Sequence, residues 1–292
     1  MNDLDSREPA SPGRVVGVVG LGAMGGPIAR HLLDESVAVV CADLDPELLS
    51  TYANRGARPA EGLADLAACS DVVLVVVQTD EDVMAVCTGP GSVLPSCRPG
   101  TSVLLCSSIR PETCKLVAAS APNGVNVLDA ALTGGVRGAE AGTINLLVGG
   151  DADVLDTVRP LLKPWTSHVH HLGPLGTGQV AKTVNNLIHW AQISAITESL
   201  ELGRRYGLDV ATLRAALMDG PTYSRSLRDL ELLRFTWHAK DIANAETMAT
   251  AVGLPLPMAE TAREVMQTID VAKVAALLTR GGDGDGREIT SA

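Results

Sequence analysis

The chain has 292 residues, of which 46% are hydrophobic, and this is enough apolar material for a large core in one or two domains. Acidic residues outnumber basic ones by 34 to 23, the formal net charge is -11, and only 2% of residues are aromatic. This balance argues against a general binder of nucleic acid or of anionic membranes, and against base stacking on an aromatic surface.

The cysteines and the N-terminal segment bear on redox state and location. Six cysteines stand at irregular spacings without a Cys-x-x-Cys pair, so we expect reduced core thiols and neither a disulfide framework nor a zinc site. Residues 1–13 are polar and contain proline, unlike a signal peptide, and we expect a disordered leader. No apolar run is suited to a membrane span, so the sequence indicates a cytoplasmic protein.

A glycine-rich turn follows the first expected strand, residues 14–19, and precedes an expected helix over residues 27–33. The turn is Gly20-Leu21-Gly22-Ala23-Met24-Gly25, a Gly-x-Gly-x-x-Gly pattern. Its first two glycines permit a tight turn and close approach of the backbone to a pyrophosphate, while the helix N-terminus supplies N–H donors. The pattern therefore predicts a dinucleotide site.

The second expected strand, residues 37–42, ends at Asp43. An acidic side chain about 20 residues after the glycines accepts hydrogen bonds from the adenosine ribose in dinucleotide-binding folds. Asp43 and Asp45 would also repel a 2′-phosphate, and no arginine follows the strand directly, so we predict NAD rather than NADP. The alternative is that Asp43 only caps the helix that begins near Pro46.

Strand and helix patterns then alternate, which predicts a parallel, doubly wound α/β sheet whose ligands bind beyond the C-terminal strand ends. The expected elements are a helix over 63–68, a strand over 72–77, a helix over 81–87, a strand over 102–107 and a helix over 111–121. Two strand ends are polar, Gln78-Thr79 and Ser107-Ser108, and each is a candidate wall of the nicotinamide side. Val77, Gln78 and Ser108 are the expected cofactor contacts there. Polar residues at a helix start are also commonplace, so a purely local role is the alternative.

The next expected strand, residues 125–132, carries Asp129 in its middle and ends at Thr133. The segment after it contains four glycines, including Gly134 and Gly135, whose N–H groups could line an anion site together with the Thr133 hydroxyl. A small carboxylate would suit this site, although a hairpin-like connection to a strand over 144–149 would also explain it. A helix over 151–162 and a strand over 169–172 complete the expected sheet.

His168, His170 and His171 lie beside this last strand. No carboxylate or cysteine stands nearby in the sequence, so we expect no metal site here.

The segment from Gly176 to His189 reads as a glycine hinge that leads directly into a helix. At the helical period, Lys182, Asn186 and His189 fall on one face, so an amine, an amide and an imidazole lie together. No charged residue occurs between residues 183 and 197, and we expect this helix to be buried on most sides. A lysine whose stem packs while its ammonium reaches water is the simpler alternative.

Beyond residue 174 the sequence indicates only helices, so we expect a cofactor-binding domain over 14–174 and an all-α domain over 175–280. The expected helices cover residues 179–206, 210–218, 226–233, 240–252, 258–267 and 271–279. The tail over 281–292 is rich in glycine and charge and is expected to be disordered.

With four motifs in order over residues 14–280, the chain resembles the β-hydroxyacid dehydrogenase family, which includes 3-hydroxyisobutyrate dehydrogenase and tartronate semialdehyde reductase. The motifs are the Gly20–Gly25 loop, Asp129–Gly135 with Gly138–Thr143, Gly176-x-Gly178-x-x-x-Lys182-x-x-Asn185-Asn186, and Lys240-Asp241. The resemblance implies a Rossmann-type domain like that of 6-phosphogluconate dehydrogenase, followed by a helical domain. The long extra helical region of the phosphogluconate enzymes is missing, which disfavours their decarboxylating chemistry.

The resemblance also implies roles for individual residues. Lys182 would be the catalytic acid and base, Asn186 would bind substrate, and the substrate carboxylate would lie against Thr133, Gly134 and Gly135. Lys240 would contact the cofactor, and Ser108 would approach the nicotinamide ribose. Thr133 replaces the usual serine, Ala131 the usual proline, and His189 an aliphatic residue, which puts the substrate in doubt more than the reaction.

The implied reaction is oxidation of a small 3-hydroxy acid to its semialdehyde with NAD, or the reverse reduction. A lysine can accept the hydroxyl proton only when it is neutral, a form that burial and the positive nicotinamide would favour. Imine reduction with NAD(P)H is an alternative that Lys182 disfavours, and a non-catalytic dinucleotide-binding protein is another. The uncharged helix would bury a face against a second subunit in a homodimer or homotetramer.

Overall fold

The computed structural model describes residues 13–279 of the chain, so the expected disordered leader and tail lie almost wholly outside the described residues. The described chain divides after Lys182 into two compact units. This division falls inside a helix, later than the boundary expected after Pro174, because the first turn of that helix is bound to the sheet. The partition into a cofactor-binding and a substrate-binding domain stays a prediction.

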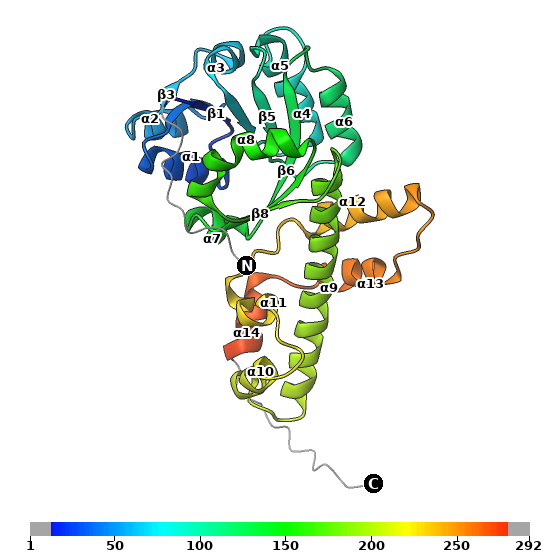
Figure 1. The fold of residues 1–292 in the computed structure, drawn as a ribbon. Coiled ribbons are helices and arrows are strands. Elements are labelled where there is room, and N and C mark those ends of the chain that lie inside the picture. The colour runs from blue at the N-terminus through cyan, green and yellow to red at the C-terminus, as the bar shows by residue number, and fades with distance from the viewer. Residues whose placement is uncertain (1–12, 280–292) are drawn as a thin grey trace. The chain divides into compact units, whose positions relative to one another are not determined.

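An eight-stranded, mostly parallel sheet forms the centre of the first unit, in the order β3-β2-β1-β4-β5-β6-β7-β8 (Figure 1). Its strands are β1 (Val15–Val19), β2 (Ala38–Ala42), β3 (Arg58–Pro59), β4 (Val72–Val75), β5 (Ser102–Leu105), β6 (Asn126–Thr133), β7 (Ile144–Gly149) and β8 (Thr166–His171). The short apolar runs are buried because the parallel strands are covered on both faces. The expected Rossmann-type fold is confirmed.

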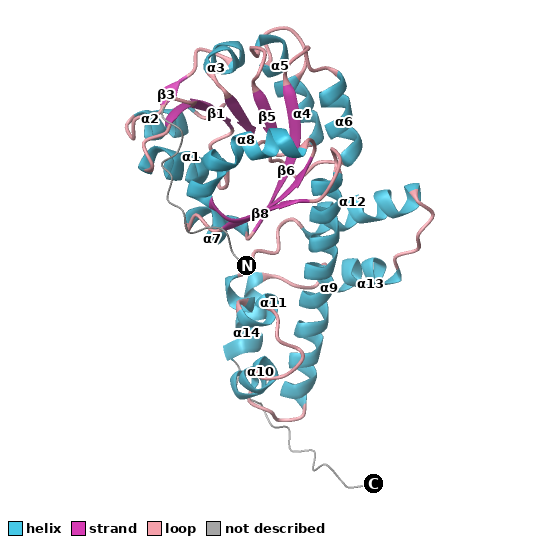
Figure 2. Cartoon of the chain, viewed as in Figure 1, coloured by secondary structure: helices cyan, strands magenta, loops and turns pink. Residues whose placement is uncertain are grey.

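Helices cover both faces of this sheet, as Figure 2 shows. They are α1 (Gly25–Asp34), α2 (Pro46–Ala53), α3 (Leu63–Cys69), α4 (Asp80–Cys87), α5 (Val93–Ser96), α6 (Pro111–Ala119), α7 (Gly135–Glu140) and α8 (Ala152–Leu162). Apolar residues of α1, α2, α7 and α8 pack in one core cluster, and those of α3, α4, α5 and α6 in another. Alternate strand residues face the two clusters, as Leu74 and Val75 do.

Some parts of the sheet differ from the sequence expectation. Strand β7 runs antiparallel to β6, as a hairpin-like connection requires, so the sheet is not wholly parallel. The connection is not an open loop, because residues 135–140 form helix α7. The short elements β3 and α5 were not predicted, since two and four residues are too few to show a hydrophobic period.

The second unit is helical in its described residues. It contains most of α9 (Thr177–Arg205), then α10 (Val210–Met218), α11 (Arg225–Arg228), α12 (His238–Ala251), α13 (Pro257–Met266) and α14 (Val271–Thr279). The helix expected over 226–233 ends early and is followed by a 3₁₀ turn, Leu230–Leu232. A third core cluster, centred on Ile193, Leu200 and Ile242, packs these helices together.

Helix α9 is not buried on most sides, which corrects the sequence expectation. Val180, Val184 and Ile188 are exposed to 41%, 52% and 54% and recur every four residues, so they form one apolar stripe along the helix. Trp190 and Ile193 lie on a different side and are buried. The stripe is called the α9 stripe below.

None of the helices within residues 13–279 combines the length and the apolar character that crossing a membrane requires.

Candidate active site

Strand register brings the predicted cofactor residues of the first unit to one edge of the sheet. Val19 pairs with Val75, Val75 with Leu105, and Leu105 with Asp129, so these residues form one row across four parallel strands. The chain leaves each of the first three strands at or just after this row. The carboxyl edge of an open parallel sheet is where such folds bind ligands, and the loops after β1, β2, β4, β5 and β6 all lie there.

The glycine turn after β1 has the geometry of a dinucleotide loop. Gly20 adopts a φ of +93°, and its N–H donates to the Ala42 carbonyl at 2.9 Å. A Cβ at Gly25 would overlap the Gly20 carbonyl oxygen, so this glycine is required by the turn itself. A Cβ at Gly22 would meet no atom within 4 Å, and its φ is unexceptional. The turn therefore needs glycine at residues 20 and 25. The space beside the backbone of Gly22 is open, and it is called the cradle below.

The remaining members of this turn differ in exposure. Leu21 is buried, Met24 is half-buried, and Ala23 is exposed together with Gly22.

Asp43 follows β2 and lies against this turn. Its carboxylate accepts hydrogen bonds from the Leu21 N–H at 2.5 Å and the Asp45 N–H at 2.8 Å. Asp45, rather than Asp43, is the N-cap of α2 and accepts from the Glu47 N–H. The alternative that Asp43 only caps α2 is therefore wrong, and its half-buried carboxylate borders the predicted cofactor loop.

The two predicted nicotinamide walls, after β4 and β5, are joined by a hydrogen bond. The Val77 N–H donates to the Ser107 hydroxyl oxygen at 3.0 Å, and that hydroxyl lies 3.4 Å from the Val75 carbonyl, to which it donates. Gln78 is exposed and Ser108 half-buried beside these contacts. The structure thus brings together residues that are about thirty positions apart.

The predicted carboxylate subsite lies where β6 ends. Thr133 is buried, its hydroxyl donates to the Asn145 carbonyl at 2.9 Å, and the Asn145 side-chain amide donates to that hydroxyl at 3.1 Å. Gly134 and Gly135 follow with φ of +113° and +64°, and both are exposed. The glycine backbone is accessible, whereas the threonine hydroxyl is already paired across the β6–β7 ladder.

The first turn of α9 is anchored to the sheet by Asp129. This side chain is fully buried, and its carboxylate accepts from the N–H groups of Gly176 and Gln179, the latter at 2.8 Å. Burial raises the pKa of Asp129, while the hydrogen bonds from Gly176, Gln179 and Gly178 act in the opposite direction. A Cβ at Gly178 would clash with the Leu147 carbonyl and the Asp129 carboxylate, so glycine allows this close approach.

Gln179 makes a second connection, between α9 and the loop after β5. It is 1% exposed, its side-chain N–H donates to the Ser107 carbonyl at 2.8 Å, and its side-chain oxygen accepts from the Ile109 N–H at 3.2 Å. Sequence reasoning missed these roles of Asp129 and Gln179. A buried acid inside an apolar strand was the available signal, because such a group requires partners.

Lys182 is half-buried on α9, one turn after Gln179, and Asn186 is 8% exposed one further turn along the same helix. The Asn186 side-chain oxygen accepts from the Asn185 amide at 3.1 Å. Amine and amide therefore share a helix face, as the sequence indicated.

His189 lies within a polar contact of the second unit. One ring nitrogen, Nδ1, lies 2.9 Å from the Ser226 hydroxyl, which in turn donates to Gln192 at 3.2 Å. The ring also packs against Trp190, with centroids 4.9 Å apart. These contacts fit both a substrate-binding role and a satisfied core histidine.

Lys240 is half-buried near the start of α12, next to Asp241. The Trp190 indole N–H donates to the Asp241 carboxylate at 3.0 Å, which ties the start of α12 to the middle of α9. This contact fixes the backbone that carries Lys240.

Two other groups of residues are the histidines of β8 and the six cysteines. His168 and His170 stack with ring centroids 6.0 Å apart, yet residues 13–279 contain no group of three or more histidine, cysteine, aspartate or glutamate side chains arranged to hold a metal. All six cysteines are free thiols, and burial raises the pKa of Cys106 to about 12.

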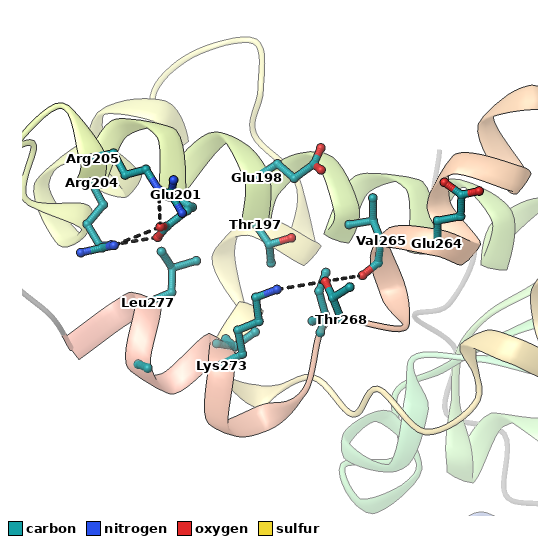
Figure 3. A pocket seen from close by; sticks show the side chains of 13 residues that line it. Thr197, Glu198, Glu201, Arg204, Arg205, Glu264, Val265, Thr268, Lys273 and Leu277 are labelled. Atoms are coloured by element: carbon teal, nitrogen blue, oxygen red, sulfur yellow. Dashed lines mark hydrogen bonds and ion pairs between the residues drawn. The ribbon is translucent and has the colours of Figure 1, made fainter.

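A surface hollow of about 510 Å³ lies between α9, α13 and α14 of the second unit (Figure 3). Glu201 forms ion pairs with Arg204 and Arg205, and the Lys273 amine donates to the Thr268 hydroxyl. None of the predicted site residues lines this hollow.

Two family models match the chain, one after the other. The NAD binding domain of 6-phosphogluconate dehydrogenase matches residues 15–173, and the NAD-binding domain of NADP-dependent 3-hydroxyisobutyrate dehydrogenase matches residues 176–277. Together they span both structural units.

Individual relatives agree with these models. The chain is 31% identical to 2-(hydroxymethyl)glutarate dehydrogenase of Eubacterium barkeri, over 86% of this chain and 88% of the relative. It is 31% identical to 2-hydroxy-3-oxopropionate reductase of Escherichia coli, over 87% of this chain and 90% of the relative. The solved structure of Mycobacterium tuberculosis 3-hydroxyisobutyrate dehydrogenase with L-serine is similar, with a TM-score of 0.81, 27% identity, and coverage of 91% of this chain and 99% of that one. The chain therefore belongs to the β-hydroxyacid dehydrogenase family of NAD(P)-dependent oxidoreductases.

Proposed function

We propose that this protein oxidises a small 3-hydroxy acid to the corresponding semialdehyde with NAD, or catalyses the reverse reduction, with Lys182 as acid and base. The observation that carries the proposal is the anchoring of α9. Asp129 and Gln179 fix the first turn of this helix at the carboxyl edge of the sheet, and Lys182 follows one turn later. The lysine is thereby tied to the same edge as the cofactor loop.

The residues at this edge fit a dinucleotide. The open cradle at Gly22 permits a pyrophosphate to approach the backbone, and the N-terminus of α1 follows directly. Asp43 would hold the adenosine ribose, Val77 and Gln78 would line the cofactor further along the edge, and Ser108 would lie on the nicotinamide side. When bound, the nicotinamide ring supplies or accepts the hydride.

NAD rather than NADP is proposed because of the charge beside the cradle. The Asp43 carboxylate lies against the Leu21 N–H, and Asp45 is two residues further on. A 2′-phosphate placed there would face two negative charges without an arginine directly after the strand. A ribose hydroxyl could instead donate to Asp43.

Lys182 would manage the proton in either direction. In oxidation the neutral amine would accept the proton of the substrate hydroxyl, and in reduction the ammonium would return a proton to the carbonyl oxygen. Asn186, one turn further along, would donate to or accept from the same oxygen through its side-chain amide. Lys240 would bind the cofactor through its positive charge.

The substrate carboxylate would be bound after β6. Gly134 and Gly135 are exposed, and their N–H groups would donate to the carboxylate, while the Thr133 hydroxyl could contribute by turning away from Asn145. His189 would lie near the distal end of the substrate and favour a polar tail. These features support a small, polar hydroxy acid.

The proposal is tested by following NAD reduction with a panel of hydroxy acids. The panel comprises 3-hydroxyisobutyrate, 3-hydroxypropionate, glycerate, threonate, 4-hydroxybutyrate, 2-(hydroxymethyl)glutarate and L-serine. We expect saturable turnover with at least one acid, and a kcat for that acid that falls by about 10² to 10⁴-fold in the Lys182→Ala variant. Tight NAD binding without turnover of any acid or semialdehyde would instead indicate a non-catalytic dinucleotide-binding protein.

We also propose that the protein is a homodimer or a higher homo-oligomer. The α9 stripe leaves three apolar side chains exposed in a row on the longest helix of residues 13–279. Such a contiguous apolar surface is more typical of a subunit interface than of a solvated face. A second copy of the same helix would cover it.

A further inference from the structure

The side chain of Gln179 makes two hydrogen bonds that flank Ser108, and this pair of hydrogen bonds is called the bracket below. Its amide N–H donates to the carbonyl of Ser107, the residue before Ser108, and its amide oxygen accepts from the N–H of Ile109, the residue after it. Both contacts are buried, and they join positions about seventy residues apart. One amide thus holds the backbone on both sides of the residue that the proposed function places next to the nicotinamide ribose.

Other contacts fix the rest of this loop to the segment between β4 and α4 and to the first residue of α4. The Ser107 hydroxyl accepts from the Val77 N–H, and the Arg110 N–H donates to the Asp80 carboxylate at 3.0 Å. Hydrogen bonds from Thr113 and Arg110 outweigh burial and hold the pKa of Asp80 below its usual range, so its carboxylate remains an acceptor. Gln179 connects this fixed loop to the helix that carries Lys182.

Gln179 also lies on the functional face of α9. Lys182 and Asn186 follow it by three and seven residues, a spacing that places all three side chains on one side of a helix. The backbone of Gln179 is itself held by the buried Asp129 carboxylate. The path from the Ser108 backbone to Lys182 therefore consists of two hydrogen bonds and one turn of an anchored helix.

We propose that Gln179 is a positioning residue. It holds Lys182 on α9 at a fixed position relative to the Ser108 loop, and so aligns proton transfer with hydride transfer. This inference rests on the proposed function. The amide is suited to the task because it offers one donor and one acceptor in a fixed plane, matching the carbonyl and the N–H that flank Ser108. A displacement of about 1 Å between reacting groups can cost about 100-fold in rate, so loss of the bracket should lower kcat.

The first test replaces Gln179 by leucine, which has a similar size but can make neither hydrogen bond. We expect kcat to fall by about 10- to 100-fold, while KM for the acid and Kd for NADH change little. A loss confined to KM or Kd, or unchanged kinetics, would overturn the inference.

The second test replaces Gln179 by glutamate, which has nearly the same shape. A protonated glutamate can donate to the Ser107 carbonyl as the glutamine does, whereas the ionised form would place a charge against that carbonyl. Burial favours the protonated form up to a higher pH than for an exposed glutamate. We expect the ratio of kcat in Gln179→Glu to kcat in the wild type to rise as the pH falls, while the ratio for Gln179→Leu stays flat. A flat ratio for the glutamate variant would contradict the inference.

A matched control separates positioning from a general loss of stability. Thr101, directly before β5, is 2% exposed, and its hydroxyl donates to the Ser70 carbonyl at 3.3 Å. Thr101→Val removes this buried hydrogen bond beside the strand without changing the shape of the side chain. We expect it to lower the midpoint of thermal unfolding yet leave kcat and its pH profile unchanged, with all variants assayed at pH values where they remain folded.

Hydrogen exchange reports on the bracket without any substrate. In Gln179→Leu we expect faster exchange of the Ile109 N–H, with wild-type Kd for NADH. If no acid is turned over by the wild type, the proposed function fails while this exchange result still tests the bracket. If turnover is found but the exchange of Ile109 is unchanged in Gln179→Leu, the positioning role fails and the proposed function stands.

Discussion

Lys182 is the residue on which the proposed chemistry depends. Replacing it by alanine should lower kcat by about 10² to 10⁴-fold, because general acid and base catalysis contributes about that much. Lys182→Arg should be nearly as slow, since guanidinium is always protonated and cannot accept a proton. Stopped-flow or steady-state rates together with NADH titration check this.

A matched control for these variants is Lys115→Ala on the exposed side of α6. Wild-type activity in Lys182→Ala would exclude Lys182 as the acid and base, whereas loss of NADH binding in that variant would point to a cofactor role.

Asp43 tests the choice between NAD and NADP. Asp43→Ser should raise KM for NAD by about 10- to 100-fold, since hydrogen bonds to a charged group contribute about 1.5 to 3 kcal/mol, and should lower KM for NADP. Steady-state kinetics with both cofactors measures this shift. Asp209→Ser makes the same change at the N-cap of α10 and should leave both constants unchanged. Equal kinetics of the Asp43 variant and the wild type would remove Asp43 from the cofactor site.

The turn after β1 and the start of α9 both lie at the carboxyl edge of the sheet. At both places glycine lets neighbouring groups come close to the backbone. We expect their glycines to separate into those required for folding and those required for cofactor binding. Asp129 also depends on nearby backbone groups. Its carboxylate is buried in a strand, and the N–H groups at the start of α9 stabilise it by hydrogen bonds.

The glycine turn allows a direct comparison of these two requirements. Gly22→Ala should keep the wild-type unfolding midpoint, because its Cβ meets no atom within 4 Å, but should weaken NADH binding by filling the cradle. Gly25→Ala should lower the unfolding midpoint, because its Cβ overlaps the Gly20 carbonyl. Differential scanning fluorimetry with and without NADH measures both effects. Unchanged NADH affinity in a folded Gly22→Ala would argue against a pyrophosphate at this turn.

At the scale of the whole molecule, the α9 stripe predicts self-association. Val184→Glu places a charge in the middle of the stripe and should shift the protein toward the monomer, because an unpaired charge cannot be buried in an apolar interface without a large cost. Light scattering coupled to size exclusion gives the mass.

Leu116→Glu, on an exposed position of α6, is the matched control and should leave the mass unchanged. A wild-type protein that is already monomeric would refute the proposed oligomer.

The sequence alone determined the features that depend on local pattern. The alternation of strands and helices, the glycine turn with Asp43, and the polar face of α9 with Lys182 and Asn186 all follow from periods of two to seven residues and from backbone sterics. These signals lie within one element and its adjacent turn, so they survive without knowledge of the neighbours. The Rossmann-type fold and the family followed from them.

Only the tertiary structure decided what depends on contacts between distant segments. The antiparallel pairing of β7 with β6 and the contacts of Asp129 and Gln179 join positions that no local period connects. The physical reason is that a buried polar group takes its partner from whichever backbone the fold brings near it. For this chain, those partners lie at the carboxyl edge of the sheet, where the first turn of α9 is held.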